Sequence, residues 1–240
     1  MAIKVGVLGA SGRMGSEVCK AVCNDPETTL VAAIDEMKIG QDATNSNIRI
    51  TDDLSNIEGA DVVVDFTTAN SARKNLPAIA EMGIHAVVGT TGLAETDIEK
   101  LKGVFTNSNC VIASNFAISA VLMMRFSEMA APHFDNVEII EYHHNSKIDA
   151  PSGTALSTAE RIGASSKSWN QSSTVDLAFD GARGGITEDG ISIHSVRMEG
   201  MVAHQDVIFG TEGQTLTIRQ DSYDRSSFMP GVLIAVKGIE

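Results

Sequence analysis

Hydrophobic and polar positions give the first half of the chain an alternation of buried strands and amphipathic helices. Short apolar runs rich in β-branched residues predict strands, and the segments between them carry apolar residues at helical spacing. We expect strands at residues 3–8, 29–34, 60–66, 84–88 and 110–113, and helices at 16–23, 71–82 and 95–105. This alternation predicts an α/β fold, a Rossmann-type doubly wound parallel sheet, over residues 1–114.

The pattern changes to period-two alternation after Asn136, which is typical of antiparallel strands. Strands are expected at residues 137–142, 191–196, 205–209 and 215–219, with a helix at 154–162 and a polar loop at 163–190. A helix at 118–133 precedes them. We expect its apolar stripe to fill a core, namely Met123, Met124, Phe126 and Met129. Residues 115–219 are therefore predicted to form an α+β domain with a mostly antiparallel or mixed sheet.

The C-terminal segment is apolar, and residues 228–236 follow a helical pattern. We expect residues 220–240 to pack back on the first domain. The chain would then consist of a dinucleotide-binding domain, residues 1–114, and a substrate-binding and oligomerisation domain, residues 115–219.

A glycine-rich turn, GASGRMG at residues 9–15, joins the first predicted strand to the first helix. Small residues let the backbone approach a pyrophosphate, and the helix N-terminus faces its charge. The spacing is GxxGxxG rather than GxGxxG, so a plain turn between packed elements is an equally good explanation of the glycines alone. Asp35 ends the next strand, twenty residues after Gly15, where a carboxylate accepts hydrogen bonds from an adenosine ribose. The two features together predict dinucleotide binding.

The cofactor is expected to be NADH, NADPH or both. Asp35 would repel the 2′-phosphate of NADPH, whereas Arg13 or Lys38 could accommodate it, so the preference stays open. The strand at residues 84–88 ends in GTTG, and such loops line the ligand crevice of a doubly wound sheet. We expect it to contact the nicotinamide. The hydroxyls of Thr90 and Thr91 are also suited to capping the next helix, and both roles can hold.

The stretch EYHHNSKIDAPSGTA, residues 141–155, concentrates groups that transfer protons and bind anions. Histidine exchanges protons near neutral pH, and Lys147 follows His143 by four residues. Ser152 is a suitable N-cap for the next helix, whose free backbone N–H groups can bind carboxylates or phosphates. Adjacent histidines are more often a solvated strand end, and a zinc site is a weak third reading because no third ligand has suitable spacing. The whole combination favours a catalytic site without a metal.

Composition excludes several classes of partner. The chain has 240 residues and a net charge of −13, which disfavours nucleic acid and anionic membranes as partners. The three cysteines form no secreted disulfide framework, and Cys19 and Cys23, one helical turn apart, are expected to be buried apolar side chains. The N-terminal residues predict a strand rather than a leader, and no apolar run reaches transmembrane length. We expect a reduced cytoplasmic protein.

The central stretch resembles the signature of the 4-hydroxy-tetrahydrodipicolinate reductase (dihydrodipicolinate reductase) family of the diaminopimelate–lysine pathway. The family pattern Glu-x-His-His-x-x-Lys-x-Asp-Ala-Pro-Ser-Gly-Thr-Ala is met at every defined position. GASGRMG, DFT at 65–67, GTTG at 89–92 and SNF at 114–116 are similar to the family's cofactor-side motifs. HSVRMEGMVAHQDVIFG at 194–210 resembles strands of its second domain. The resemblance covers nearly the whole chain.

The resemblance implies a role for each matching residue. His143 would be the acid/base residue and Lys147 a proton donor. The substrate carboxylates would be bound by His144 and by the helix entry at Ser152, Gly153 and Thr154. The cofactor would contact Gly9, Ala10, Ser11, Gly12, Arg13, Met14, Asp35, Gly89, Thr90, Thr91, Ala113, Ser114, Asn115 and Phe116.

The resemblance also implies an activity and an assembly. The enzyme would reduce 4-hydroxy-tetrahydrodipicolinate, a cyclic dicarboxylate, to tetrahydrodipicolinate with loss of water, using NADH or NADPH. Family members are typically homotetramers assembled through the sheet of the second domain. Two departures stand out: Glu36 replaces an arginine that some members carry, which weakens the case for NADPH, and the tail that commonly follows the last helix is missing after Glu240, so we expect its contacts to be absent.

Two other functions remain as rivals. A dehydrogenase for another amino or keto acid, such as one like aspartate dehydrogenase, would share the first domain but has no need of the His-His-Lys stretch. A non-catalytic nicotinamide-nucleotide sensor would keep the glycine turn and Asp35 but could lose His143 and Lys147. Both residues are present, which favours the reductase.

Overall fold

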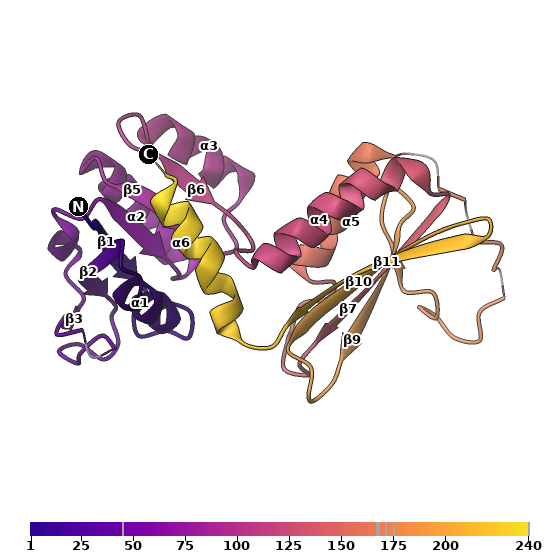
Figure 1. The fold of residues 1–240 in the computed structure, drawn as a ribbon, viewed down its shortest axis with the longest axis horizontal. Coiled ribbons are helices and arrows are strands. Elements are labelled where there is room, and N and C mark those ends of the chain that lie inside the picture. Colours follow the sequence, from indigo (N-terminus) through magenta and orange to yellow (C-terminus); the bar gives the residue numbers. More distant parts are fainter. Residues whose placement is uncertain (45, 167–168, 171, 175, 240) are drawn as a thin grey trace. The chain divides into compact units, whose positions relative to one another are not determined.

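The chain folds into two compact units, and the computed structural model describes residues 1–44, 46–166, 169–170, 172–174 and 176–239. Unit 1 consists of Met1–Phe116 and Phe228–Glu240, and unit 2 of Ala117–Ser227 (Figure 1). Residues 220–227, which we expected to pack on the first domain, lie in unit 2 because the last strand of its sheet continues to Ser222.

Unit 1 contains the predicted doubly wound parallel sheet. Its strands run in the order β3-β2-β1-β4-β5-β6, and all neighbours pair in parallel. The strands are β1 (Ile3–Leu8), β2 (Thr28–Ile34), β3 (Ile50–Thr51), β4 (Val62–Asp65), β5 (His85–Val88) and β6 (Cys110–Ile112). The helices are α1 (Gly15–Asn24), η1 (Leu54–Ile57), α2 (Ala69–Glu81), α3 (Glu95–Val104) and α6 (Met229–Lys237).

Side chains on both faces of this sheet are buried, which explains the continuous apolar runs of its strands. On one face, α1 and α6 pack against alternate residues of β1, β4 and β5, including Val5, Val64 and Val87. On the other face, η1, α2 and α3 pack against β2, β4 and β5, including Val63 and Val88. The helix α6 comes from the far end of the chain, and Lys237 at its end forms ion pairs with Asp25 and Glu27 beyond α1.

Unit 2 is an α+β layer of one mixed sheet and two helices. The strands run in the order β11-β10-β7-β9-β8. They are β7 (Asn136–His143), β8 (Gly185–Ile186), β9 (Ser192–Arg197), β10 (Ala203–Thr211) and β11 (Gln214–Ser222). The helices α4 (Ile118–Ala130), which continues into η2 (Ala131–His133), and α5 (Gly153–Ser165) cover one face. Arg225–Phe228 form a short 3-10 helix, η3, before α6.

The sheet of unit 2 is mixed and mostly antiparallel, as expected: β7 and β9 pair in parallel, and its other neighbouring strands pair antiparallel. Alternation alone does not distinguish the two kinds of pairing, because both ladders have period two. Two other expectations, the burial of the whole apolar stripe of α4 and of Cys23, were wrong. Met123 and Met124 are buried, but Phe126 and Met129 are 50% and 62% exposed because they lie on the outer side of α4. Cys19 is buried as predicted, whereas Cys23 is exposed at the end of α1. Positions 167, 168, 171 and 175 of the predicted polar loop lie outside the described residues.

No helix among the described residues is long and apolar enough to cross a membrane. Within the same residues, no group of three or more His, Cys, Asp or Glu is placed to hold a metal ion.

Candidate active site

The glycine turn of unit 1 is shaped by two close backbone approaches. Gly9 has a φ of +77°, and a Cβ there would lie 2.4 Å from the carbonyl oxygen of Phe66. A Cβ on Gly15 would lie 2.0 Å from the carbonyl oxygen of Gly9. The first turn of α1 can therefore pack this closely against the loop only if residue 15 is glycine. Met14 precedes α1 without a side-chain cap, and an uncapped helix entry is suited to binding an anion.

Asp35 closes this turn from the neighbouring strand. One carboxylate oxygen accepts the Ser11 N–H at 3.0 Å and the other accepts the Met37 N–H at 2.9 Å. A cavity of about 390 Å³, the Asp35 cavity, opens beside it and is lined by Leu8, Gly9, Gly12, Ile34, Asp35, Glu36, Met37, Asp52, Leu54, Phe66, Thr67, Thr68, Ser71, Lys74 and Asn75. The Asp35 carboxylate, the glycine turn and the cavity therefore lie next to one another, which is the arrangement that the dinucleotide hypothesis requires.

A second cavity, the Thr90 cavity, lies at the carboxyl ends of β4, β5 and β6 in the same unit. Its volume is about 440 Å³, and it is lined by Arg13, Met14, Phe66, Thr67, Gly89, Thr90, Thr91, Ser114, Asn115, Phe116 and Phe228. Phe66 and Thr67 line both cavities, so the two adjoin. Together they offer two neighbouring compartments, as a dinucleotide requires for its two halves.

The wall between the cavities is fixed by a buried carboxylate that the sequence analysis left without a role. Asp65 is 0% exposed, and one of its oxygens accepts the Thr90 hydroxyl at 2.6 Å and the Thr67 N–H at 3.0 Å. A Cβ on Gly89 would lie 2.1 Å from the Phe66 ring, so this glycine makes room for the aromatic wall. The DFT motif was the available signal for Asp65 and Phe66.

Other predicted cofactor residues have structural positions. Ala10 is buried in the core, and Ala113 packs against that core. Of the two cations considered for a 2′-phosphate, Arg13 lines the Thr90 cavity rather than the Asp35 cavity. Lys38 donates its Nζ to the carbonyl oxygen of Ser11 at 3.4 Å.

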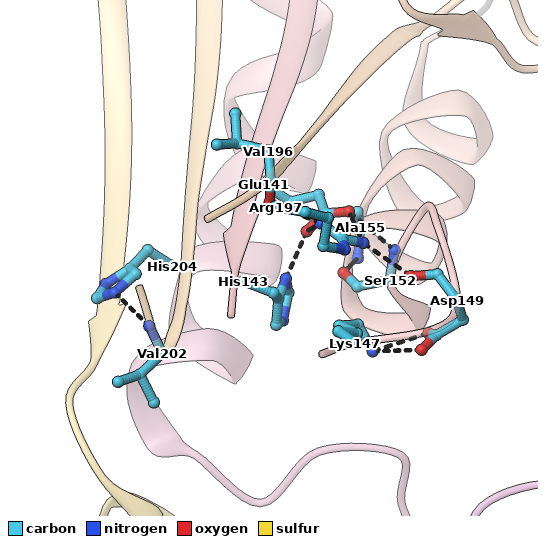
Figure 2. Close-up of polar contacts among 10 residues, drawn as sticks. All are labelled: Glu141, His143, Lys147, Asp149, Ser152, Ala155, Val196, Arg197, Val202 and His204. Atoms are coloured by element: carbon cyan, nitrogen blue, oxygen red, sulfur yellow. Dashed lines mark hydrogen bonds and ion pairs between the residues drawn. The ribbon is translucent and has the colours of Figure 1, made fainter. Parts of the chain in front are cut away.

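In unit 2, β7 carries Glu141 and His143 to the entry of α5. Glu141 is 0% exposed, and its carboxylate contacts Nδ1 of His143 (Figure 2). The carboxylate accepts hydrogen bonds from both terminal nitrogens of Arg197, at 2.7 and 2.9 Å. It also accepts the Ser152 N–H at 3.3 Å. Side chains two residues apart on a strand share a face, which is why Glu141 and His143 can meet.

The ionised form of Glu141 is stabilised despite its burial. Desolvation raises the pKa of this carboxyl, but the hydrogen bonds from His143 and Arg197 outweigh it and bring the pKa down to about 2. A buried charge requires such partners, and the bidentate guanidinium is one of them.

Lys147 belongs to the same polar network through Asp149. Its ammonium lies 2.7 and 2.8 Å from the two carboxylate oxygens of Asp149, and this contact lowers the pKa of Asp149 (Figure 2). The carbonyl oxygen of Asp149 accepts Nη2 of Arg197 at 2.8 Å. The structure therefore links His143, Glu141, Arg197 and Lys147 in one chain of contacts.

The helix entry that the sequence predicted lies at the start of α5. Ser152 is the N-cap, and its hydroxyl accepts the Ala155 N–H at 3.2 Å. A Cβ on Gly153 would meet nothing within 4 Å, so the space in front of the first turn is open. Thr154 follows in that turn and is half-buried. His144 lies just past β7, and its Nδ1 contacts the Ser146 hydroxyl at 2.8 Å.

Arg197 is the residue that the sequence analysis missed most clearly. It pairs with His143 across the β7–β9 ladder, fifty-six positions from Glu141 along the chain. Another histidine in the resembling stretch, His204, contacts Val202 and Asp221 instead.

Comparison with known proteins assigns the chain to a family. The model of the dihydrodipicolinate reductase N-terminus matches residues 3–116, and that of the C-terminus matches residues 119–240. A 4-hydroxy-tetrahydrodipicolinate reductase from Corynebacterium urealyticum is 47% identical, over 99% of this chain and 93% of its own. One from Corynebacterium efficiens is 48% identical, over 100% and 94%.

Solved structures agree with this assignment. Dipicolinate-bound dihydrodipicolinate reductase from Paenisporosarcina sp. TG-14 is similar over 100% of this chain and 95% of that chain, with a TM-score of 0.88 and 37% identity. An aspartate dehydrogenase from Thermotoga maritima shares the fold alone, with a TM-score of 0.56 and 12% identity over 100% and 97% of the two chains. The expected family is thereby confirmed: the chain belongs to the dihydrodipicolinate reductases.

Proposed function

We propose that the chain catalyses the NAD(P)H-dependent reduction of 4-hydroxy-tetrahydrodipicolinate to tetrahydrodipicolinate and water. The observation that carries the proposal is the network of His143, Lys147 and the α5 entry around buried Glu141. Relatives that bear this activity in their names are 46–48% identical over nearly the whole chain. The Paenisporosarcina relative was solved with dipicolinate, a cyclic dicarboxylate.

In unit 1, the residues present fit a nicotinamide dinucleotide. Gly9 and Gly12 line the Asp35 cavity without side chains, which lets a pyrophosphate approach the backbone at the entry of α1, and Asp35 offers a carboxylate to ribose hydroxyls. A nicotinamide in the Thr90 cavity would contact residues that line it, namely Phe66, Gly89 to Thr91 and Ser114 to Phe116. When bound, the reduced nicotinamide supplies a hydride.

In unit 2, the side chains bind and protonate the substrate. The backbone N–H groups at Gly153 and Thr154 and the side chain of His144 bind its carboxylates. Lys147 or protonated His143 delivers the proton that the ring needs as electron density arrives. Asp149 holds the Lys147 side chain in place beside this site, through the contact of 2.7 Å between its carboxylate and Nζ.

The test follows the absorbance of reduced nicotinamide with substrate made in situ by the preceding synthase. We expect substrate-dependent oxidation by the wild type and a loss of roughly 10²-fold or more in kcat for Lys147→Ala. Fluorescence titration should show unchanged binding of the reduced cofactor, because Lys147 lies outside unit 1. Binding of NADH without substrate-dependent oxidation by the wild type would refute the reductase and favour a sensor or another substrate.

We further propose that NADH is preferred over NADPH. The Asp35 cavity is lined by three carboxylates, Asp35, Glu36 and Asp52, and by the ammonium of Lys74. The excess negative charge opposes a 2′-phosphate there. The variant Glu36→Gln should lower the KM for NADPH by a factor of about 2 to 5 and leave that for NADH unchanged. An equal change for both cofactors would contradict this assignment.

From the family resemblance we also propose a homotetramer assembled through the sheet of unit 2. Sedimentation equilibrium should give about four times the chain mass of 25.4 kDa. A monomer at micromolar concentration would refute the assembly without affecting the proposed reaction.

A further inference from the structure

The carboxylate of Glu141 is surrounded by donors from three different segments. Nδ1 of His143 comes from its own strand, the guanidinium of Arg197 from β9, and the Ser152 N–H from the entry of α5. The Glu141 side chain is 0% exposed, and that of Arg197 is 18% exposed. Water therefore has little access to this carboxylate, and its orientation is set by the protein.

An ionised carboxylate can only accept hydrogen bonds, so it dictates which nitrogen of a neighbouring imidazole carries a proton. Arg197 is also a pure donor, so it cannot take the place of the acceptor. With Glu141 ionised, Nδ1 of neutral His143 must be the N–H, and Nε2 must be the free acceptor. The lowered pKa of Glu141, about 2, keeps it ionised across the neutral range.

We propose that Glu141, fixed by Arg197, is a positioning residue that holds His143 as the Nδ1–H tautomer and presents Nε2 for proton exchange with the substrate. The inference deepens the proposed reductase function and rests on it. Because the same carboxylate accepts the Ser152 N–H, it also ties the ring to the helix entry that binds the substrate carboxylates. One buried group thus sets the position of the proton-exchange atom relative to the anion site.

The charged groups of this network come from every neighbouring segment. Glu141 lies on β7 with His143, Arg197 reaches in from β9, and Lys147 and Asp149 come from the loop before α5. The Lys147–Asp149 pair is joined to the network through the Asp149 carbonyl oxygen, which accepts a hydrogen bond from Arg197. Glu141 is therefore the acceptor that decides the His143 tautomer.

The direct test reads the tautomer of His143 by long-range ¹H–¹⁵N NMR of the full-length protein, assigned with a His143→Asn variant. In the wild type, at a pH where the imidazole is neutral, we expect Nδ1 to be protonated and Nε2 to be bare. In Glu141→Gln the side-chain amide can donate as well as accept, so the Nε2–H tautomer should become populated. An unchanged tautomer in this variant would overturn the proposal.

The kinetic test separates positioning from binding. Glu141→Gln should lower kcat by roughly 10²-fold with little change in KM, since the substrate contacts remain. Glu141→Asp, which keeps the charge, should recover part of the loss. The matched control is Glu138→Gln on the opposite face of β7, which should leave kcat and the His143 tautomer unchanged.

Loss of folding in the single variant would not remove the test, because Glu141→Gln/Arg197→Gln leaves no unpaired guanidinium. We expect this double variant to fold and to populate the Nε2–H tautomer. A double variant that keeps the Nδ1–H tautomer would refute the role of Glu141. If the wild type shows the expected tautomer but no reductase activity, the proposed function fails while the positioning of His143 by Glu141 stands.

Discussion

Two glutamates of strand β7, one on each face, are each surrounded by a histidine and an arginine, and the two clusters differ in burial. On the helix-covered face, Glu141 is 0% exposed and contacts His143 and Arg197. On the opposite face, the side chain of Glu138 is 37% exposed and contacts His194 and Arg183. Residues three apart on a strand point in opposite directions, so the two clusters share a backbone but not an environment.

Burial changes how strongly the same three groups depend on one another. Burial raises and hydrogen bonds lower the pKa of both carboxyls, with a net lowering in each case. Only for Glu141 is the lowering large, to about 2. On the exposed face, water and salt can replace either partner at small cost, whereas on the buried face nothing replaces a missing one. The buried cluster is therefore the one that can impose a tautomer.

The largest effect should come from removing the buried charge alone. Glu141→Gln leaves the guanidinium of Arg197 with little water and no counter-charge, which should cost about 3 kcal/mol of the free energy of unfolding. Urea denaturation at pH 7 measures it. In Glu141→Gln/Arg197→Gln most of that loss should be recovered. If Glu141→Gln lowered the free energy of unfolding by less than about 1 kcal/mol, the Glu141–Arg197 pair would contribute no more than an ordinary surface ion pair, and this prediction would be wrong.

The pH dependence of stability should show the same difference in another way. The pKa of Glu141 is about 2 in the folded chain against an ordinary 4.5, so its ionised form contributes stability above about pH 4.5. That contribution, on the order of 3 kcal/mol, is lost as pH falls toward 2. The difference in unfolding free energy between wild type and Glu141→Gln should therefore shrink between pH 4.5 and 2. A difference that stays constant over this range would contradict the lowered pKa.

The same comparison shows where sequence reasoning succeeds. Periodicity predicted β1, β2, β4, β5 and β6 of unit 1 to within a few residues, because a strand buried on both faces is a continuous apolar run. It did not predict β3, which is only two residues long. The signature at 141–155 predicted His143, Lys147 and Ser152, and the structure places all three in one network. Local chemistry and local spacing were enough for these residues.

The missed residues depend on contacts between distant segments. Glu141 could have been noticed, since it lies two positions before His143 and therefore on the same face. Arg197 could not, because its place opposite His143 depends on the parallel pairing of β7 with β9, which alternation does not reveal. The exposure of Phe126 and Met129 was missed for a similar reason: composition does not tell which side of α4 meets the sheet.

The smallest effect should come from the exposed cluster. Glu138→Gln removes contacts with Arg183 and His194 that are 35% and 24% exposed, so the free energy of unfolding should fall by less than about 1 kcal/mol. At roughly 1 M NaCl, where the screening length is about 3 Å, even this difference should disappear, while that of Glu141→Gln persists. Urea denaturation of both variants at low and high salt measures the contrast. Equal salt sensitivity of the two variants would mean that burial does not separate the two faces of β7.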